Sequence, residues 1–254
     1  MELNHKLTSI EFDRAVNNKT NANDHQLEDK GGYQRIVSRL LYLTMIRPDI
    51  IFVVKVLSQY MHALKQSHLE AAMRVVRYIK NAPRLGLIVP TDNTLKIAAY
   101  CDSDWRACVE TRKSITGYAI KFGDALISWK SKKQETMSRS SAEAEFRSMA
   151  ANVAKIIWMI GLFKELGSEI AANPIFHKRT KHIDIDCHFV REKNQEGKIQ
   201  TQHTRTKEQL ADLLTKSMCR PQHNYLMDKL GMKNMYSSLS LRGSIEVSGD
   251  TNVT

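Results

Sequence analysis

Few cysteines occur in this 254-residue chain. The four are Cys101, Cys108, Cys187 and Cys219, and no two of them form a CxxC pair. Zinc knuckles and disulfide frameworks need paired or regularly spaced cysteines, so the sequence indicates neither. We interpret the four thiols as buried or incidental side chains.

A long apolar run is also absent. No stretch approaches the roughly 20 apolar residues that span a bilayer, and the N-terminal segment MELNHKLTSIEFD lacks the apolar core of a signal peptide. We therefore expect a protein of the cytosol or nucleus with no membrane partner. The apolar content of 42% is nevertheless that of a globular protein with a real core.

Acidic residues are outnumbered by basic ones. The chain has 38 Lys and Arg against 27 Asp and Glu, which leaves a net charge of +11. This balance favours a polyanionic partner such as nucleic acid over an acidic protein or a neutral metabolite, although charge alone does not separate nucleic acid from a membrane surface. We expect a nucleic-acid partner and no small-molecule substrate, and the sequence predicts no particular oligomeric state.

The chain divides by composition and periodicity into four parts. Residues 1–32 form a polar lead-in arm, and residues 33–90 carry apolar positions at helical spacing that predict three amphipathic helices, with Pro48 opening the second. Residues 91–236 form the main domain. Residues 237–254 are a Ser- and Gly-rich tail that we expect to be disordered.

The main domain begins with strands. Residues 95–102 alternate apolar and polar side chains, and two further strand-like runs flank Gly123-Asp124, a two-residue turn typical of a hairpin. These three runs predict an antiparallel meander. A capping box at Ser140-x-x-Glu143 then opens a long helix that ends at Gly167.

Further helices are expected downstream. Apolar residues from Phe176 to Val190 recur at steps of four and three, which predicts a helix, and a short strand follows near residues 198–203. Thr206-x-x-Gln209 predicts the cap of a last helix carrying Leu210, Leu213 and Leu214.

Three carboxylates stand at element ends where they could converge. Asp102 ends a predicted strand, while Glu145 and Asp212 fall in the first turns of predicted helices. Taken singly, each acid near a helix start is best read as a cap or as compensation for the helix dipole. Only the sequence context that they share favours a common site.

That context resembles one family along nearly the whole chain. The segments YCDSDW, TRKSITGYAIKFGDALISWKSKKQETMSRSSAEAEFRSMA, NPIFHKRTKHIDIDCHFVREK and EQLADLLTK are similar, in order, to the ribonuclease H domain of a Ty1/copia-type retrotransposon Pol polyprotein. Residues 6–80 resemble the segment of that polyprotein that links reverse transcriptase to ribonuclease H. No polymerase, integrase or zinc-knuckle motif accompanies them.

The resemblance implies a fold and a chemistry. The fold would be α/β, with a ribonuclease H-like mixed sheet flanked by helices and preceded by a small helical segment. Asp102, Glu145 and Asp212 would be catalytic residues that bind Mg²⁺ or Mn²⁺, and the substrate would be the RNA strand of an RNA–DNA hybrid. Two metal ions about 4 Å apart would activate water and stabilise the leaving oxygen.

One part of the family pattern is missing. The family has, after the long helix, a strand ending in Cys-Asp-Asn whose Asp is the third metal ligand, whereas here only Ser168, Glu169 and Ile170 separate Gly167 from Ala171. A strand, a helical turn and their loops need roughly 20 residues. We therefore expect one central strand to be deleted, the edge of the meander to be unpaired, and no rescue of the lost ligand by Glu169, Asp184 or Asp186.

The basic side chains concentrate around these acidic positions. A solvated charged face is the common explanation for a basic run, but clusters that flank a hydrolytic site would contact phosphates without reading sequence. The candidate nucleic-acid-binding residues are Lys130, Lys132, Lys133, Arg139, Arg179, Lys181 and His182.

Two functions follow from the sequence. The first is a ribonuclease H-type enzyme, weakened or inactivated by loss of the third carboxylate. The alternative is a non-catalytic nucleic-acid-binding remnant of the same ancestry, held to hybrids by its basic surface.

Overall fold

The computed structural model describes residues 7–16, 24–27, 29–90, 96–166, 175–178 and 184–235. A helical half comes first. It contains α1 (Ile10–Val16), α2 (Lys30–Leu43), η1 (Pro48–Ile50), α3 (Ile51–Leu57), η2 (Ser58–Tyr60) and α4 (Gln66–Asn81). The three helices predicted from the periodicity of residues 33–80 are therefore confirmed, with Pro48 starting a 3₁₀ turn that continues into α3.

The helical half has its own core. Tyr33, Val37, Val54, Leu57 and Ala72 are among the buried side chains that α2, α3 and α4 bring together. The lead-in arm joins this half through Lys65, whose ammonium pairs with Asp13 at 2.6 Å and Asp24 at 3.0 Å. Helix α1 in that arm was not predicted from the sequence.

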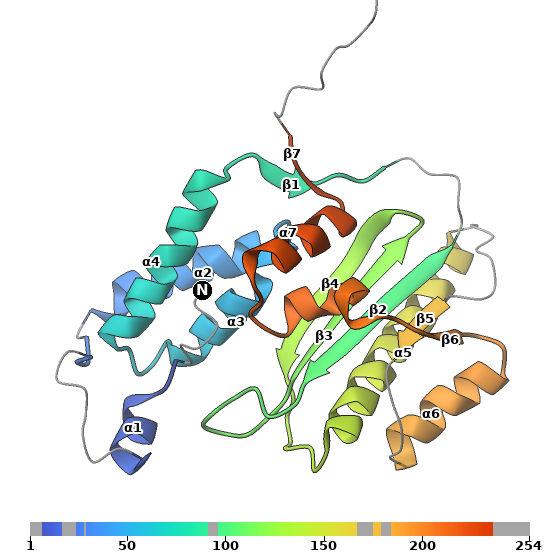
Figure 1. The fold of residues 1–254 in the computed structure, drawn as a ribbon, viewed down its shortest axis with the longest axis horizontal. Coiled ribbons are helices and arrows are strands. Elements are labelled where there is room, and N and C mark those ends of the chain that lie inside the picture. Colours follow the sequence, from blue (N-terminus) through green and yellow to red (C-terminus); the bar gives the residue numbers. More distant parts are fainter. Residues whose placement is uncertain are drawn as a thin grey trace, which may run out of the picture.

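The second half is a five-stranded mixed sheet in the order β4-β3-β2-β5-β6 (Figure 1). Its strands are β2 (Ile97–Asp104), β3 (Ile115–Phe122), β4 (Ala125–Lys133), β5 (Ile175–Lys178) and β6 (Gln200–His203). The first three form an antiparallel meander, and β5 and β6 then add in parallel to β2. The predicted turn lies at Gly123, whose φ of 56° suits glycine.

Helices cover both faces of this sheet. Helix α5 (Ser141–Glu165) packs with α6 (Asp184–Gln195) against one face, and the 3₁₀ helix η4 (Leu210–Leu214) with α7 (Arg220–Lys229) covers the other, toward the helical half (Figure 1). The remaining elements are a 3₁₀ turn, η3 (Thr206–Glu208), and a two-stranded sheet that pairs β1 (Leu85–Leu87) with β7 (Met232–Asn234). The strand order and the helical layers confirm an α/β, ribonuclease H-like fold.

Alternation along β2 decides which layer each side chain meets. Ile97, Ala99 and Cys101 are buried in the core beneath α5, whereas Tyr100 packs in the core on the η4 side. Because side chains of a strand alternate between faces, Asp102 is directed to the same side as Tyr100. Its carboxylate is thereby brought to the layer that contains η4.

Helix α5 is long and apolar enough, by length and composition, to cross a membrane. Its apolar content is explained by the sheet core, since Phe146, Met149, Val153 and Ile156 are all buried there. As predicted, Ser140 caps this helix: its hydroxyl accepts a hydrogen bond from the Glu143 N–H.

The expected loss of a central strand is wrong. Strand β5 lies between β2 and β6, with Ala98 paired to Ile175 and Tyr100 paired to His177, so the meander edge is not left open. Four residues at about 3.3 Å each are enough to fill this position. Of the predicted helix from Phe176 to Val190, residues 176–178 are strand and residues 184–190 are helical, while residues 179–183 lie outside the described part of the chain.

The last predicted helix also differs. Residues Leu210–Leu214 form a 3₁₀ helix rather than an α-helix, and the Gln209 side chain, not Thr206, accepts from its first free N–H at Ala211. Residues 167–171, where the deletion was inferred, and the tail 237–254 lie outside the described residues.

Candidate active site

Asp102 lies near the end of β2, beside η4. The Thr215 hydroxyl donates a hydrogen bond to Asp102 Oδ2 at 2.5 Å. The Asp102 side chain is 18% exposed, so it is held from one side and open on another.

Asp212 reaches the same place from η4 and is buried. The Gln209 amide fixes η4 to β2 by donating to the Cys101 carbonyl at 3.1 Å. Gly117 of β3 lets η4 come close, because a Cβ there would lie 2.7 Å from Thr215 Cγ2 and 2.9 Å from Leu214 Cβ. The glycine is thus required by close approach rather than by backbone angle.

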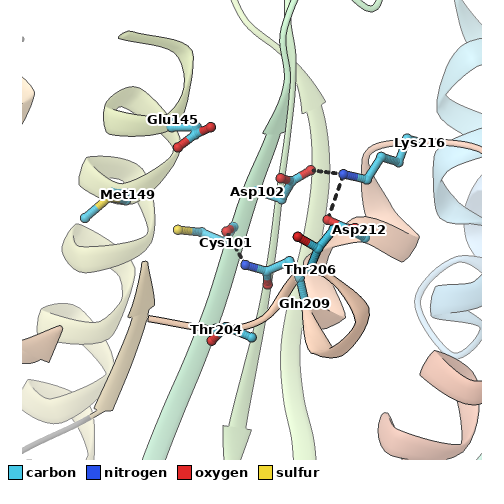
Figure 2. Close-up of a pocket in the computed structure, with 9 residues that line it drawn as sticks. All are labelled: Cys101, Asp102, Glu145, Met149, Thr204, Thr206, Gln209, Asp212 and Lys216. Atoms are coloured by element: carbon cyan, nitrogen blue, oxygen red, sulfur yellow. Dashed lines mark hydrogen bonds and ion pairs between the residues drawn. The ribbon is translucent and has the colours of Figure 1, made fainter. Parts of the chain in front are cut away.

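Lys216 bridges the two aspartates (Figure 2). Its ammonium lies 2.9 Å from Asp212 Oδ1 and 3.5 Å from Asp102 Oδ2. This residue was not singled out in the sequence, although its position four residues after Asp212 on the ADLLTK motif offered the signal. It places one positive charge between two negative ones.

The two aspartates perturb one another. Burial, and after it the nearby Asp102 carboxylate, raise the pKa of Asp212 to about 7 against the opposing effect of Lys216. Burial alone would lower the pKa of Lys216, but the Asp102 and Asp212 carboxylates outweigh it and raise that pKa. A carboxyl that titrates near neutrality in a cleft is a mark of a functional site.

Glu145 comes from the first turns of α5, on the opposite wall. Figure 2 shows its carboxylate pointing across the cleft toward Asp102. Helix α5 is fastened to β2 at this level, since the Ser148 hydroxyl donates to the Asp102 carbonyl at 2.9 Å and the Asn152 amide to the Tyr100 carbonyl at 3.4 Å. The register of α5 on β2 therefore sets the position of Glu145.

All three predicted catalytic residues line one cleft. Its walls comprise Cys101, Asp102, Glu145, Met149, Thr204, Thr206, Gln209, Asp212 and Lys216, and its volume is about 30 Å³. A space of that size is large enough for water or a small ion. The sequence reading thus found three residues that the fold does bring together from β2, α5 and η4.

The fit to a metal ion is partial. Carboxylate oxygens are the donors that Mg²⁺ prefers, and one or two carboxylates with waters are enough for a single ion. No group of three or more His, Cys, Asp or Glu among the described residues is already arranged to hold a metal, and Lys216 stands between two of the three acids. Lys216 would have to leave its place between Asp102 and Asp212 before the carboxylates of the cleft could hold a divalent cation.

The described part of β5 supplies no further carboxylate, because its sequence is IFHK. Asp186 of α6 lines a different groove, beside Lys130 and Arg147. Glu169 lies outside the described residues, and nothing is described of the Asp184 side chain. Within the described structure the cleft therefore has the three acids predicted from the sequence.

Part of the predicted basic surface forms a second groove. Lys130, Lys132 and Lys133 of β4 line it, and its volume is about 650 Å³. Helix α5 adds Arg147 and Lys155, which were missed although they lie eight residues apart on one helical face. Arg139 is exposed just before α5, while Arg179, Lys181 and His182 lie outside the described residues.

Comparison with known proteins agrees with the sequence motifs, although no family model matches the chain. It is 39% identical over 223 residues to the retrovirus-related Pol polyprotein from transposon RE1 of Arabidopsis thaliana, covering 82% of this chain and 15% of that protein. It is 29% identical over 227 residues to the polyprotein from transposon TNT 1-94 of Nicotiana tabacum, covering 81% and 17%. The chain thus spans less than a fifth of the length of these relatives.

One solved structure gives a looser likeness. The N-terminal RNase H domain of rv2228c from Mycobacterium tuberculosis, in a fusion with maltose binding protein, covers 52% of this chain and 96% of its own, at 13% identity and a TM-score of 0.33. That score is too low to bear on the fold, which rests on strand order. By sequence, the retrovirus-related Pol polyproteins of Ty1/copia-type transposons are homologues of this chain, which matches one segment of them.

Proposed function

We propose that the chain is a retrotransposon-derived ribonuclease H-like protein that ancestrally hydrolysed RNA in RNA–DNA hybrids and is now impaired by the lack of a third metal-binding aspartate. The observation that carries this proposal is the meeting of Asp102, Glu145 and Asp212 in one cleft. Their separation in the sequence makes a purely local role as helix caps a poor explanation for all three.

The three carboxylates would hold one Mg²⁺ or Mn²⁺ ion. A bound ion would activate water or stabilise the leaving oxygen at the scissile phosphate, and the aspartate that the sequence pattern lacks would have helped to hold the second ion of a two-metal enzyme. Asp102 and Glu145 face the opening from two walls, and Asp212 must lose its proton before it can bind a cation. Retained activity would therefore be low.

The groove beside β4 and α5 would hold the nucleic acid. Lys130, Lys132, Lys133, Arg147 and Lys155 line it on the outer side of the sheet half. Such side chains contact phosphates on either strand without reading base sequence. A hybrid lying there would be oriented mainly by its backbone charge.

Cleavage of a labelled RNA–DNA hybrid tests the proposal. We expect slow cleavage that needs Mg²⁺ or Mn²⁺ and is lost in Asp102→Asn. The matched control is Asp124→Asn, which removes a hairpin carboxylate that is 77% exposed and paired only loosely with Lys121 at 3.3 Å. Cleavage that survives in Asp102→Asn would show that the cleft is not the active site.

A specific observation favours a second candidate, the non-catalytic nucleic-acid-binding remnant. Lys216 already places one positive charge between Asp102 and Asp212, where a metal ion would have to bind. The remnant should bind hybrid with a steep dependence on salt but leave it uncut with either metal. Folded, hybrid-bound protein without cleavage would decide for this candidate.

A further inference from the structure

A large cavity separates the helical half from the sheet half. Helices α3 and α4 form one wall, and the segment from Leu213 to Asn224 forms the other; its volume is about 840 Å³. Small-molecule sites commonly have volumes of roughly 300–1,000 Å³ and lie between structural units. The functions proposed above do not use this cavity.

Its floor is apolar and includes an aromatic ring. Val53, Val75 and Leu213 line it, together with Phe52 of α3. Phe52 is half-buried, yet it is not among the side chains of the three core clusters formed by the described residues. A ring that faces a cavity in this way can stack on a flat ligand.

Its rim is cationic. Arg74 of α4 and Arg220 of α7 line the cavity and are exposed, and neither has an ion-pair partner among the described residues. Guanidinium groups bind phosphate through paired N–H donors. The rim therefore favours an anionic ligand.

The two acids of the lining are already engaged. Both oxygens of Asp49 accept from the Arg47 guanidinium, at 2.9 and 2.7 Å, and Glu70 accepts from the Gln66 amide at 3.1 Å. Arg47 offsets the charge of Asp49, whereas the exposed Glu70 keeps its charge one helical turn before Arg74. The cavity combines a flat apolar floor with a rim of free positive charge.

We propose that this cavity binds a nucleoside phosphate, with the base over Phe52 and the phosphate between Arg74 and Arg220. Lys216 lines both this cavity and the carboxylate cleft. The ligand is either a free nucleotide or the end of a nucleic-acid strand that continues toward the cleft. Binding of a strand end rests on the proposed function. Binding of a free nucleotide does not rest on it, and it would contradict the sequence-based expectation that the protein has no small-molecule substrate.

Binding of AMP to the full chain, measured by calorimetry, tests the proposal. AMP should bind more tightly than inorganic phosphate or adenosine. Phe52→Ala should weaken AMP binding about tenfold, which is the loss expected for one stacked base. The double variant Arg74→Glu with Arg220→Glu should weaken AMP binding by at least about tenfold. Arg77→Glu, on the same helix but outside the cavity lining, should leave AMP affinity unchanged.

Alkylation of Cys219 by iodoacetamide gives a second readout. Cys219 is exposed and lines the cavity, whereas Cys108 is half-buried elsewhere. AMP should protect Cys219 and leave the reaction of Cys108 unchanged. Stronger protection by a 5′-phosphorylated oligoadenylate than by AMP would assign the site to a strand end, and equal protection would assign it to free nucleotides.

Two results would overturn the proposal. One is AMP binding no tighter than that of inorganic phosphate. The other is folded protein, shown by a cooperative thermal transition, that neither binds AMP nor gains protection at Cys219. Because neither readout involves cleavage, a chain that binds AMP but leaves hybrids uncut would contradict the proposed hydrolysis alone.

Discussion

Two charge clusters, one buried in the helical half and one partly exposed in the sheet half, differ in their ratio of positive to negative side chains. In the helical half, Arg47 and Asp49 are one cation and one anion, and Tyr78 completes the set by donating to Asp49 Oδ2 at 2.9 Å. In the sheet half, Asp102 and Asp212 share the single ammonium of Lys216. The first cluster is matched and holds structure together; the second is short of positive charge and is suited to take up a cation.

The largest effect should come from breaking the matched cluster. Asp49→Ala leaves the Arg47 guanidinium buried and without its carboxylate, which typically lowers the free energy of unfolding by about 3–5 kcal/mol. Urea unfolding measures this. Glu135→Ala, which breaks an exposed pair with Lys132, should change stability by less than about 1 kcal/mol; equal losses in the two variants would erase the distinction between matched and exposed pairs.

Removing a negative charge from the cluster of Asp102, Asp212 and Lys216 should instead raise the free energy of unfolding. The pKa of Asp212 is about 7 in the folded chain and near 4 in an unfolded one. The folded state thus binds the extra proton, so this group makes the free energy of unfolding fall as the pH rises from about 4 to 7. Asp212→Asn should remove this decrease in the free energy of unfolding between about pH 4 and pH 7.

At pH 8 the Asp212→Asn variant should therefore be more stable than the parent by about 1–2 kcal/mol, while losing metal binding. Urea unfolding at pH 5 and pH 8 checks both the gain and its pH dependence. A variant that is less stable at pH 8, with an unchanged pH profile, would mean that Lys216 fully compensates the buried carboxylate.

A smaller effect should follow from removing the bridging ammonium. Lys216→Gln takes away the cation that competes for Asp102 and Asp212, so Mn²⁺ affinity at pH 8 should rise about tenfold, as measured by electron paramagnetic resonance. Lys121→Gln, at the far hairpin, is the matched control. Unchanged Mn²⁺ affinity would show that the Lys216 ammonium does not compete with the metal ion for the two carboxylates.

The smallest effect concerns a single phosphate contact. Lys155→Ala on α5 should weaken hybrid binding a few-fold and reduce the slope of log affinity against log salt by about 1. Binding titrations at several salt concentrations measure that slope. Lys198→Ala, whose side chain is 54% exposed and paired with Glu196, should leave it unchanged.

The sequence predicted residues better than it predicted their surroundings. Asp102, Glu145 and Asp212 could be singled out because the motifs around them resemble those of one family, and their place at the ends of predicted elements allowed them to converge; their catalytic role stays a prediction. Lys216 was missed because its role comes from its distance to Asp102, which is 114 positions away in the chain and close only after η4 packs on β2 and β3.

The fold class was predicted correctly, whereas α1, the 3₁₀ form of η4 and strand β5 were not. The meander and α5 carry local signals, but β5 is a strand because β2 and β6 offer it hydrogen bonds on both sides. Its residues also satisfy helical spacing, and tertiary pairing overrides that preference. The strand and the third metal ligand are therefore separate questions: the strand is present, and the loss of the ligand stays a prediction.

The pairing of β1 with β7 has a consequence for how the sheet half is connected. Leu85 lies opposite Asn234, so the chain enters and leaves this half at one point, and every described strand of the five-stranded sheet lies between the two crossings. A half with neighbouring ends is tolerant of being excised, re-joined end to end or inserted into another chain. The pairing of β1 with β7 closes this half of the chain, and a short linker from residue 234 to residue 85 could replace that pairing.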